Sequence, residues 1–318
     1  MYNGFYNLTR NPFEISPDPY FYYATERHNE ALAILIYAAI RRKGFVVVTG
    51  EVGTGKTLLV RCLLQALHRN QIEVAFIFNP ILPVVEFLSH VLTDLGLPSP
   101  GSTKSEMLSQ LNNYLLERES RGRTTALVVD EAQLLSCDLL EEIRLLTNLE
   151  TTQHKLLQIV LVGQPELDQK LDSPELRQLK QRIGMRCRLE PLGPEQLRGY
   201  IQRRLELAGA NSHATTLFSE GAIAAILRFS RGIPRLVNIL CENALISGYS
   251  MQARQITPDM VAEAAADLCI DEMIVPSTSE LEDLGGLKGL MKTVPHREEL
   301  ERASQRQPDK AKSQSRTQ

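Results

Sequence analysis

The chain lacks the features that mark membrane-spanning, disulfide-linked and zinc-binding proteins. Its longest early apolar run, residues 31–40, is too short to cross a bilayer, and its first residues do not have the layout of a signal peptide. Its cysteines are odd in number and include no C-x-x-C pair. This pattern predicts reduced thiols in a cytosolic protein rather than a disulfide framework or a zinc site. The five cysteines are Cys62, Cys137, Cys187, Cys241 and Cys269.

A strong charge of either sign is also lacking. The formal net charge is −3 and the pI is about 6.1, so composition gives no reason to expect nucleic acid as the main ligand. The 318 residues are 43% hydrophobic and 23% charged. A chain of this length and composition can bury a large core and has room for one large or two modest domains.

The most informative feature present is a glycine-rich loop between a strand pattern and a helix pattern. Residues 45–49 are apolar and mostly β-branched, residues 50–57 read GEVGTGKT, and residues 58–64 begin an apolar helical pattern. This is a P-loop, in which backbone N–H groups and a helix N-terminus surround the phosphates of a nucleotide. Lys56 is expected at the terminal phosphates, and Thr57 is expected to bind Mg²⁺ through its hydroxyl. The predicted nucleotide-binding loop consists of Gly50, Glu51, Val52, Gly53, Thr54, Gly55, Lys56 and Thr57.

A second apolar strand pattern ends in two carboxylates. Residues 125–129 read TALVV, which is typical of a buried parallel strand, and Asp130 and Glu131 follow. Two adjacent acids after a strand often form only a solvated turn. In a chain with a P-loop, however, they predict that Asp130 binds nucleotide and Mg²⁺, and that Glu131 polarises the attacking water.

A third strand pattern, residues 156–163, is followed by Gln164. A polar side chain at the end of a strand beside the metal-binding strand can contact the γ-phosphate or the water, so Gln164 is a candidate sensor; a turn residue before Pro165 is the alternative. Residues 74–78 predict a further strand, and residues 84–95 and 105–117 predict helices. The alternation predicts an α/β fold with a parallel sheet covered by helices on both faces, and a nucleotide at the carboxyl ends of the strands.

Arginines follow the third strand in two places. Residues 174–189 contain four arginines and one lysine, and Arg182 is the candidate arginine finger, acting across a subunit boundary. Compensation of a helix dipole is the alternative for each of these residues, and Arg177 and Arg186 are the next candidates for the finger. Arg235 follows a Gly-Ile-Pro turn at a helix start and is expected to reach the γ-phosphate; a surface arginine is the alternative.

The pattern predicts three parts. Residues 1–192 form the P-loop ATPase domain, and residues 193–275 form a small all-helical lid. Residues 276–318 are polar without a sustained apolar period, which predicts a disordered tail. A lid that closes over the nucleotide can turn hydrolysis into motion of a bound partner. The predicted lid helices cover residues 194–208, 219–229, 234–247 and 258–269.

From about Phe5 to about Cys269, the chain resembles the AAA+ ATPases of the general secretion pathway protein A type, also called ExeA-like, which include pilus-biogenesis and exosortase-associated ATPases. The resemblance rests on NPF and SPDP near the start, GEVGTGKT, VVDEAQ, LLTNLET, LVGQPEL, LKQR and GIPR. It also implies that residues 12–28 pack near the adenine, with residues 20–23 as apolar cover. The implied roles are Walker A for Lys56 and Thr57, Walker B for Asp130 and Glu131, sensor 1 for Gln164, the finger for Arg182 and sensor 2 for Arg235.

The resemblance implies an ATPase that uses ATP and Mg²⁺ and forms a homo-oligomer. It implies a cytoplasmic protein, or one peripheral at the inner membrane, that acts on a protein partner of a secretion, pilus or exopolysaccharide system. The family prototype continues into a membrane helix and a periplasmic peptidoglycan-binding module, whereas this sequence becomes polar after Pro276, so it is closer to the shorter, soluble members.

Two alternative functions remain open. A DNA-transposition helper ATPase shares the P-loop architecture, and a nucleotide-dependent scaffold would bind ATP without hydrolysing it. The acidic pI and the absence of a recognisable helix-turn-helix or basic arm favour the secretion function over the first alternative. Glu131 argues against the second, because a pure binder needs no carboxylate to activate water.

Overall fold

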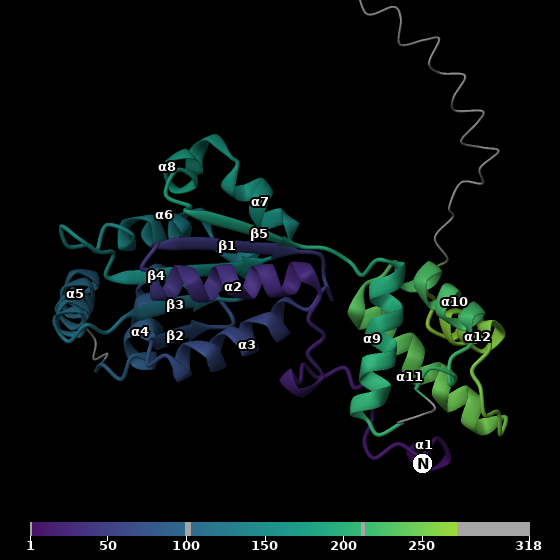
Figure 1. Cartoon of the computed structure of the whole chain (residues 1–318). Coiled ribbons are helices and arrows are strands. Elements are labelled where there is room, and N and C mark those ends of the chain that lie inside the picture. The colour runs from purple at the N-terminus through teal and green to yellow at the C-terminus, as the bar shows by residue number, and fades with distance from the viewer. Residues whose placement is uncertain (1, 99–102, 211–213, 272–318) are drawn as a thin grey trace, which may run out of the picture. The chain divides into compact units, whose positions relative to one another are not determined.

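A five-stranded parallel sheet is the centre of the fold (Figure 1). The computed structural model describes residues 2–98, 103–210 and 214–271. The strand order is β2-β3-β4-β1-β5, and every neighbouring pair is parallel. The predicted α/β fold is therefore confirmed, whereas the predicted disordered tail lies outside the described residues. The strands are β1 (Phe45–Gly50), β2 (Glu73–Ile77), β3 (Thr125–Val129), β4 (Leu157–Gly163) and β5 (Met185–Leu189).

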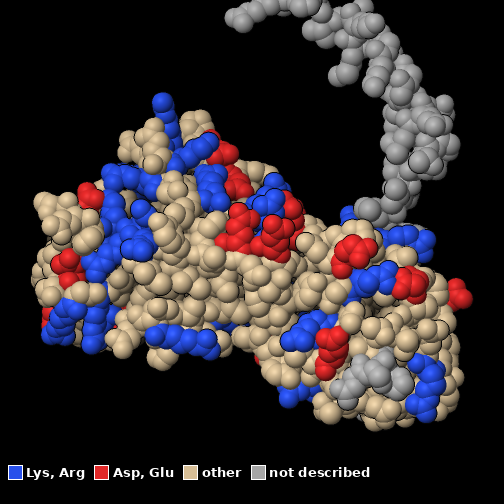
Figure 2. Space-filling model, in the orientation of Figure 1, with Lys and Arg blue, Asp and Glu red and all other residues tan. Residues whose placement is uncertain are grey.

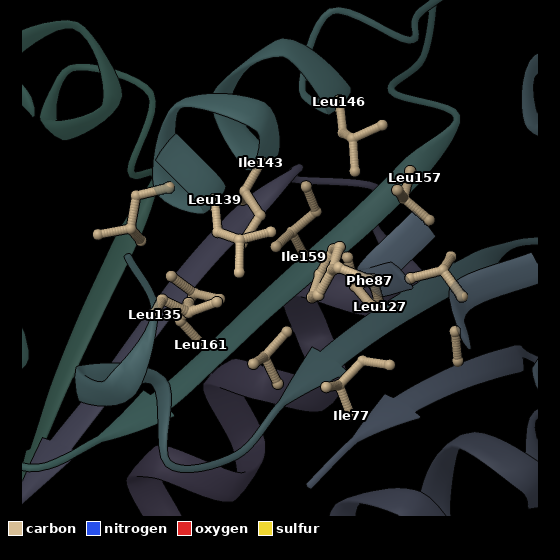
Figure 3. Packing of buried hydrophobic residues seen from close by; sticks show 14 of the residues in the cluster. Ile77, Phe87, Leu127, Leu135, Leu139, Ile143, Leu146, Leu157, Ile159 and Leu161 are labelled. Atoms are coloured by element: carbon tan, nitrogen blue, oxygen red, sulfur yellow. The ribbon is translucent and has the colours of Figure 1, made fainter. Parts of the chain in front are cut away.

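The three central strands, β3, β4 and β1, are buried along their whole length and mostly apolar, because helices cover both faces of the sheet. Successive side chains point to opposite faces, so Leu127 of β3 belongs to one core and Val128 to the other. Figure 3 shows the first core, where side chains of β2, β3 and β4 contact Phe87 and side chains of helix α6 (Cys137–Leu146), such as Leu139 and Leu146. Helices α2 (Glu26–Ile40) and α3 (Lys56–Arg69) supply the second core. The first core is built with α4 (Val84–Asp94), α5 (Lys104–Ser120), α6, α7 (Pro165–Leu171) and α8 (Arg177–Lys180).

The remaining helices share a separate core with the N-terminal residues. Phe13 is fully buried against Phe218, and the Tyr2 hydroxyl donates to the Glu242 carboxylate at 2.7 Å. No local sequence pattern predicts that the N-terminal residues pack with the C-terminal helices. Within the described residues, no helix is long and apolar enough to cross a membrane. These elements are α1 (Tyr2–Phe5), α9 (Pro194–Leu207), α10 (Glu220–Ser230), α11 (Pro234–Ser250) and α12 (Pro258–Asp267), and the short 3₁₀ turns are η1 (Pro19–Phe21), η2 (Ala132–Leu134) and η3 (Pro174–Leu176).

Candidate nucleotide-binding site

The loop between β1 and α3 has the backbone of a phosphate-binding loop. Gly53 has a φ of +81°, in the region that favours glycine, and Gly55 caps α3 with a φ of +98°. A Cβ on Gly53 would also lie 2.8 Å from Cβ of Arg235 and 3.0 Å from a methyl carbon of Ile233. Gly53 is therefore required twice, by its backbone conformation and by the close approach of α11.

Lys56 lies buried under this loop. Its Nζ donates to the carbonyl oxygens of Gly50 at 2.8 Å and Glu51 at 3.0 Å. Burial lowers the pKa of the Lys56 ammonium, and the negative charges of Glu131 and Asp130 partly offset that effect. The side chain is thus a desolvated cation that has no ion pair within 4 Å in the described part of the chain.

His28, a residue to which the sequence assigned no role, supports the loop from behind. Its Nε2 lies 3.0 Å from the carbonyl oxygen of Thr54, and its Nδ1 lies 2.6 Å from the Thr25 hydroxyl. A carbonyl oxygen only accepts, so Nε2 carries the proton and Nδ1 accepts from Thr25. Thr25 also caps α2, because its hydroxyl accepts from the His28 backbone N–H. The helix cap and the P-loop are therefore joined through one neutral imidazole.

Replacing His28 with glutamine is expected to reduce the loss of folding stability that occurs as the pH falls below about 6.5. Burial lowers the pKa of His28 below its ordinary 6.5, so the unfolded chain binds this proton more readily, and stability falls as the pH drops below about 6.5. Each pH unit in that window costs up to about 1.4 kcal/mol, or roughly 2–4 °C in melting temperature. Melting curves at pH 7.5, 6.5 and 5.5 measure the slope. The control is His154→Gln, at an exposed histidine, and an unchanged slope in His28→Gln would contradict the prediction.

Asp130, which directly follows β3, lies beside Thr57 in the first turn of α3. Asp130 is buried, and burial raises the pKa of its carboxyl, while bonds from the Glu131 backbone N–H and the Thr57 hydroxyl lower it. Mg²⁺ prefers oxygen ligands and usually takes only one or two from the protein beside nucleotide phosphates. A carboxylate and a hydroxyl on adjacent segments fit that donor set. Among the described residues, no group of three or more His, Cys, Asp or Glu side chains is arranged to hold a metal ion.

Glu131 is held by two glutamines. It has a φ of +50°, which is uncommon for a residue with a side chain. Its Oε2 accepts from Gln133 Nε2 at 2.6 Å and from Gln164 Nε2 at 3.4 Å. Gln133 Oε1 also accepts from the Gln164 backbone N–H at 3.0 Å. The structure thus brings the predicted sensor to the predicted base, and it adds Gln133, which the sequence analysis quoted in a motif without giving it a role.

A cavity of about 440 Å³ joins these elements. Its lining includes five predicted site residues besides the loop residues Val52, Gly53 and Gly55, and a stretch of the N-terminal segment, residues 14–18. Residues 20–23, which were expected as apolar cover, are not among the described residues of the lining; Phe21, for example, is buried among the C-terminal helices. The five predicted residues are Lys56, Thr57, Glu131, Gln164 and Arg235.

The C-terminal helices contribute more to the cavity than Arg235. The backbone N–H of Arg235 donates to the Gly53 carbonyl at 3.2 Å, so α11 begins on the P-loop itself. Gly232 permits this turn, because a Cβ there would lie 2.1 Å from the Leu192 carbonyl oxygen. The cavity is also lined by Tyr200 and Arg204 of α9. The sequence indicated neither, since their positions read as one face of an ordinary amphipathic helix.

Arg182 lies away from this cavity, in the exposed turn between α8 and β5. It has no ion pair within 4 Å among the described residues, although its charge helps to lower the pKa of Glu150. Arg186, by contrast, pairs with Asp168 at 3.4 Å and Asp172 at 3.6 Å. On the face shown in Figure 2, Lys and Arg side chains gather around α8 and α5. Arg182 is therefore available to another molecule, whereas Arg186 is engaged within the chain.

Comparisons with known proteins agree with this geometry. Residues 40–171 match the family model described as AAA domain. The chain is 43% identical over 269 residues to general secretion pathway protein A of Aeromonas hydrophila, an alignment that covers 84% of this chain and 48% of that protein. The chain thus spans about half the length of this curated relative.

Solved structures show the same fold at low identity. Cdc6p of Pyrobaculum aerophilum is 20% identical with a TM-score of 0.62, over 82% of this chain and 71% of that one. The ORC2 protein of Aeropyrum pernix, solved as ADPNP and ADP complexes, is 16% identical with a TM-score of 0.59, over 81% of this chain and 71% of that one. At such identities the likeness concerns the fold alone. The AAA domain match and the secretion-pathway relative show that the chain is an AAA domain protein related to general secretion pathway protein A.

Proposed function

We propose that the protein binds ATP with Mg²⁺, hydrolyses it, and couples turnover to the assembly or remodelling of a secretion or envelope system. The observation that carries the ATPase proposal is that Lys56, Thr57, Glu131, Gln164 and Arg235 all line one cavity, although they lie on both sides of the sheet domain and lid boundary. The Aeropyrum pernix protein, which shares this fold, was solved as ADPNP and ADP complexes, and this supports nucleotide binding as the proposed activity.

Each side chain has a role that follows from its position. Lys56 contacts the terminal phosphates, and Thr57 and Asp130 hold Mg²⁺, which would neutralise phosphate charge when bound. Glu131 accepts a proton from the attacking water. Gln164 and Arg235 contact the γ-phosphate from the sheet and from the lid, so the lid responds to whether that phosphate is present.

A colorimetric phosphate-release assay with ATP, with and without Mg²⁺ and with GTP for comparison, tests the activity. Mg²⁺-dependent release from ATP is the expected result, and no release under any condition would overturn the proposal. Adding double-stranded DNA to the same assay addresses the transposition alternative, because a DNA-transaction ATPase would be stimulated by it.

The secretion role rests on the relative from Aeromonas hydrophila. We place the protein in the cytoplasm or at the inner membrane, with a protein partner of a secretion, pilus or exopolysaccharide system. Affinity purification with the Glu131→Gln variant, which is expected to retain ATP, tests this proposal. Enrichment of envelope-assembly proteins supports it, whereas enrichment of a transposase would replace it with the DNA-transposition function.

The exposed Arg182 carries an expectation about assembly. If it acts on ATP held by a neighbouring subunit, Arg182→Ala and Lys56→Ala subunits are each inactive, but their mixture regains part of the activity. An intact loop on one subunit then meets an intact arginine on the next. Phosphate release from 1:1 mixtures measures this, and Arg69→Ala, at an exposed arginine near the end of α3, is the matched control. A mixture that stays inactive while both variants still assemble would assign the finger to another arginine.

A further inference from the structure

The contacts of Gln133 go beyond what its sequence motif explains. Its side-chain amide both donates and accepts hydrogen bonds. The amide nitrogen donates to Glu131 Oε2 at 2.6 Å, and the amide oxygen accepts from the Gln164 backbone N–H at 3.0 Å. The bond to Glu131 is the shorter of the two bonds that this carboxylate oxygen accepts, since the one from Gln164 Nε2 measures 3.4 Å. Gln133 therefore makes the principal contact to the predicted base.

The surroundings of Gln133 fix its position. Lys170 of α7 donates through Nζ to the Gln133 carbonyl and to the Leu135 carbonyl, both at 2.7 Å, and so clamps the backbone of η2. Gly163 leaves room for the side chain, because a Cβ there would lie 3.0 Å from the Gln133 amide oxygen. A side chain on a clamped turn, with both amide groups bonded, has little freedom to change rotamer.

Gln133 lies behind the site rather than in it. Glu131 and Gln164 line the 440 Å³ cavity, but Gln133 is not among its described lining residues. A group that does not face the cavity acts on the reaction through its neighbours. Because the tether occupies Oε2, the other carboxylate oxygen of Glu131 is left to accept a proton from water.

We infer that Gln133 is a positioning residue: it holds Oε2 of the Glu131 carboxylate and ties that carboxylate to the γ-phosphate sensor Gln164, so that Oε1 serves as the base. This inference rests on the proposed ATPase function. When ATP draws the Gln164 side chain away from its 3.4 Å bond, Gln133 keeps Glu131 in place.

Two substitutions separate the donor from the acceptor role. Gln133→Glu is isosteric and keeps an oxygen for the Gln164 N–H, but it replaces the donor to Glu131 with a second carboxylate oxygen. Gln133→Leu removes both contacts at similar size. Losing one hydrogen bond to a charged group, worth about 1.5–3 kcal/mol, predicts a fall in kcat of about 10-fold or more. The Kd for a non-hydrolysable ATP analogue is expected to stay within about twofold of the original. Gln65→Leu, at an exposed glutamine of α3, is the control.

One further readout would not respond to a merely structural role. In a Glu131→Gln background, Gln133→Leu is expected to cost nothing more, since it acts through the missing carboxylate. Unchanged kcat, or a full further loss in that background, would overturn the inference. A wild-type chain without any ATP hydrolysis would overturn the proposed function instead, so the two failures are distinguishable.

Discussion

Lys56→Ala is expected to remove measurable ATP binding. The substitution deletes a buried cation from the end of the cavity that receives the phosphates, and charge-assisted hydrogen bonds of this kind contribute about 3 kcal/mol. Such a loss raises the Kd by at least about 100-fold. Titration with a fluorescent ATP analogue, supported by calorimetry, measures it. A second readout is thermal stabilisation by ATP, which is expected in the original protein and absent from the variant.

Lys43→Ala, at an exposed lysine just before β1, is the matched control, and it is expected to bind ATP as the original does. Circular dichroism of both variants shows whether the fold is retained. Retained affinity in a folded Lys56→Ala protein would refute the assignment of this loop as the phosphate site, even though its backbone has the expected form.

The local part of the site was predictable because its determinants lie within short segments. Short runs of consecutive residues encode the glycines at positive φ and the helix that begins at Lys56. Another short run encodes the apolar strand that ends just before Asp130. The position of Gln164 near Glu131 could be predicted in the same way, because β4 pairs with β3 and the carboxyl ends of parallel strands meet at one edge of the sheet. The predicted lid helices agree with the observed bounds to within three residues, because proline, serine or threonine marks each helix start.

The fifth strand shows where the sequence was misleading. The residues of β5 read MRCRL, and their arginines were interpreted as part of a basic cluster that supplies a finger. In the structure β5 is the edge of the sheet, pairing only with β1, and Arg186 and Arg188 are its exposed alternate side chains. Charged residues are common on edge strands, where they discourage pairing with another chain. The charges of Arg186 and Arg188 are therefore explained by their place on an edge strand.

The remaining features depend on contacts between residues far apart in the chain. Tyr2 bonds to Glu242 and Arg204 bonds to the Pro12 carbonyl, and no local pattern encodes either contact. The Thr25 cap could have been recognised from its position before α2, but the reach of His28 to Thr54 could not. Gln133 is the intermediate case, because a polar residue two places after the predicted base Glu131 is visible in the sequence, whereas its bond to the backbone N–H of Gln164 is not.

Glu131→Gln is expected to separate binding from turnover. Glutamine keeps the size of the side chain but cannot accept the proton of the attacking water, and general-base assistance typically contributes 10²-fold or more. ATP affinity is expected to be preserved, because Lys56 and the loop backbone are unchanged. The variant also turns the bond from Gln133 into a contact between two amides, which allows a weaker but similar geometry.

Phosphate release together with ATP titration measures both effects, and Glu166→Gln, a nearby acid outside the cavity, is the control. Unchanged phosphate release in Glu131→Gln would show that another group activates the water, and Gln133 would then have no carboxylate base to position.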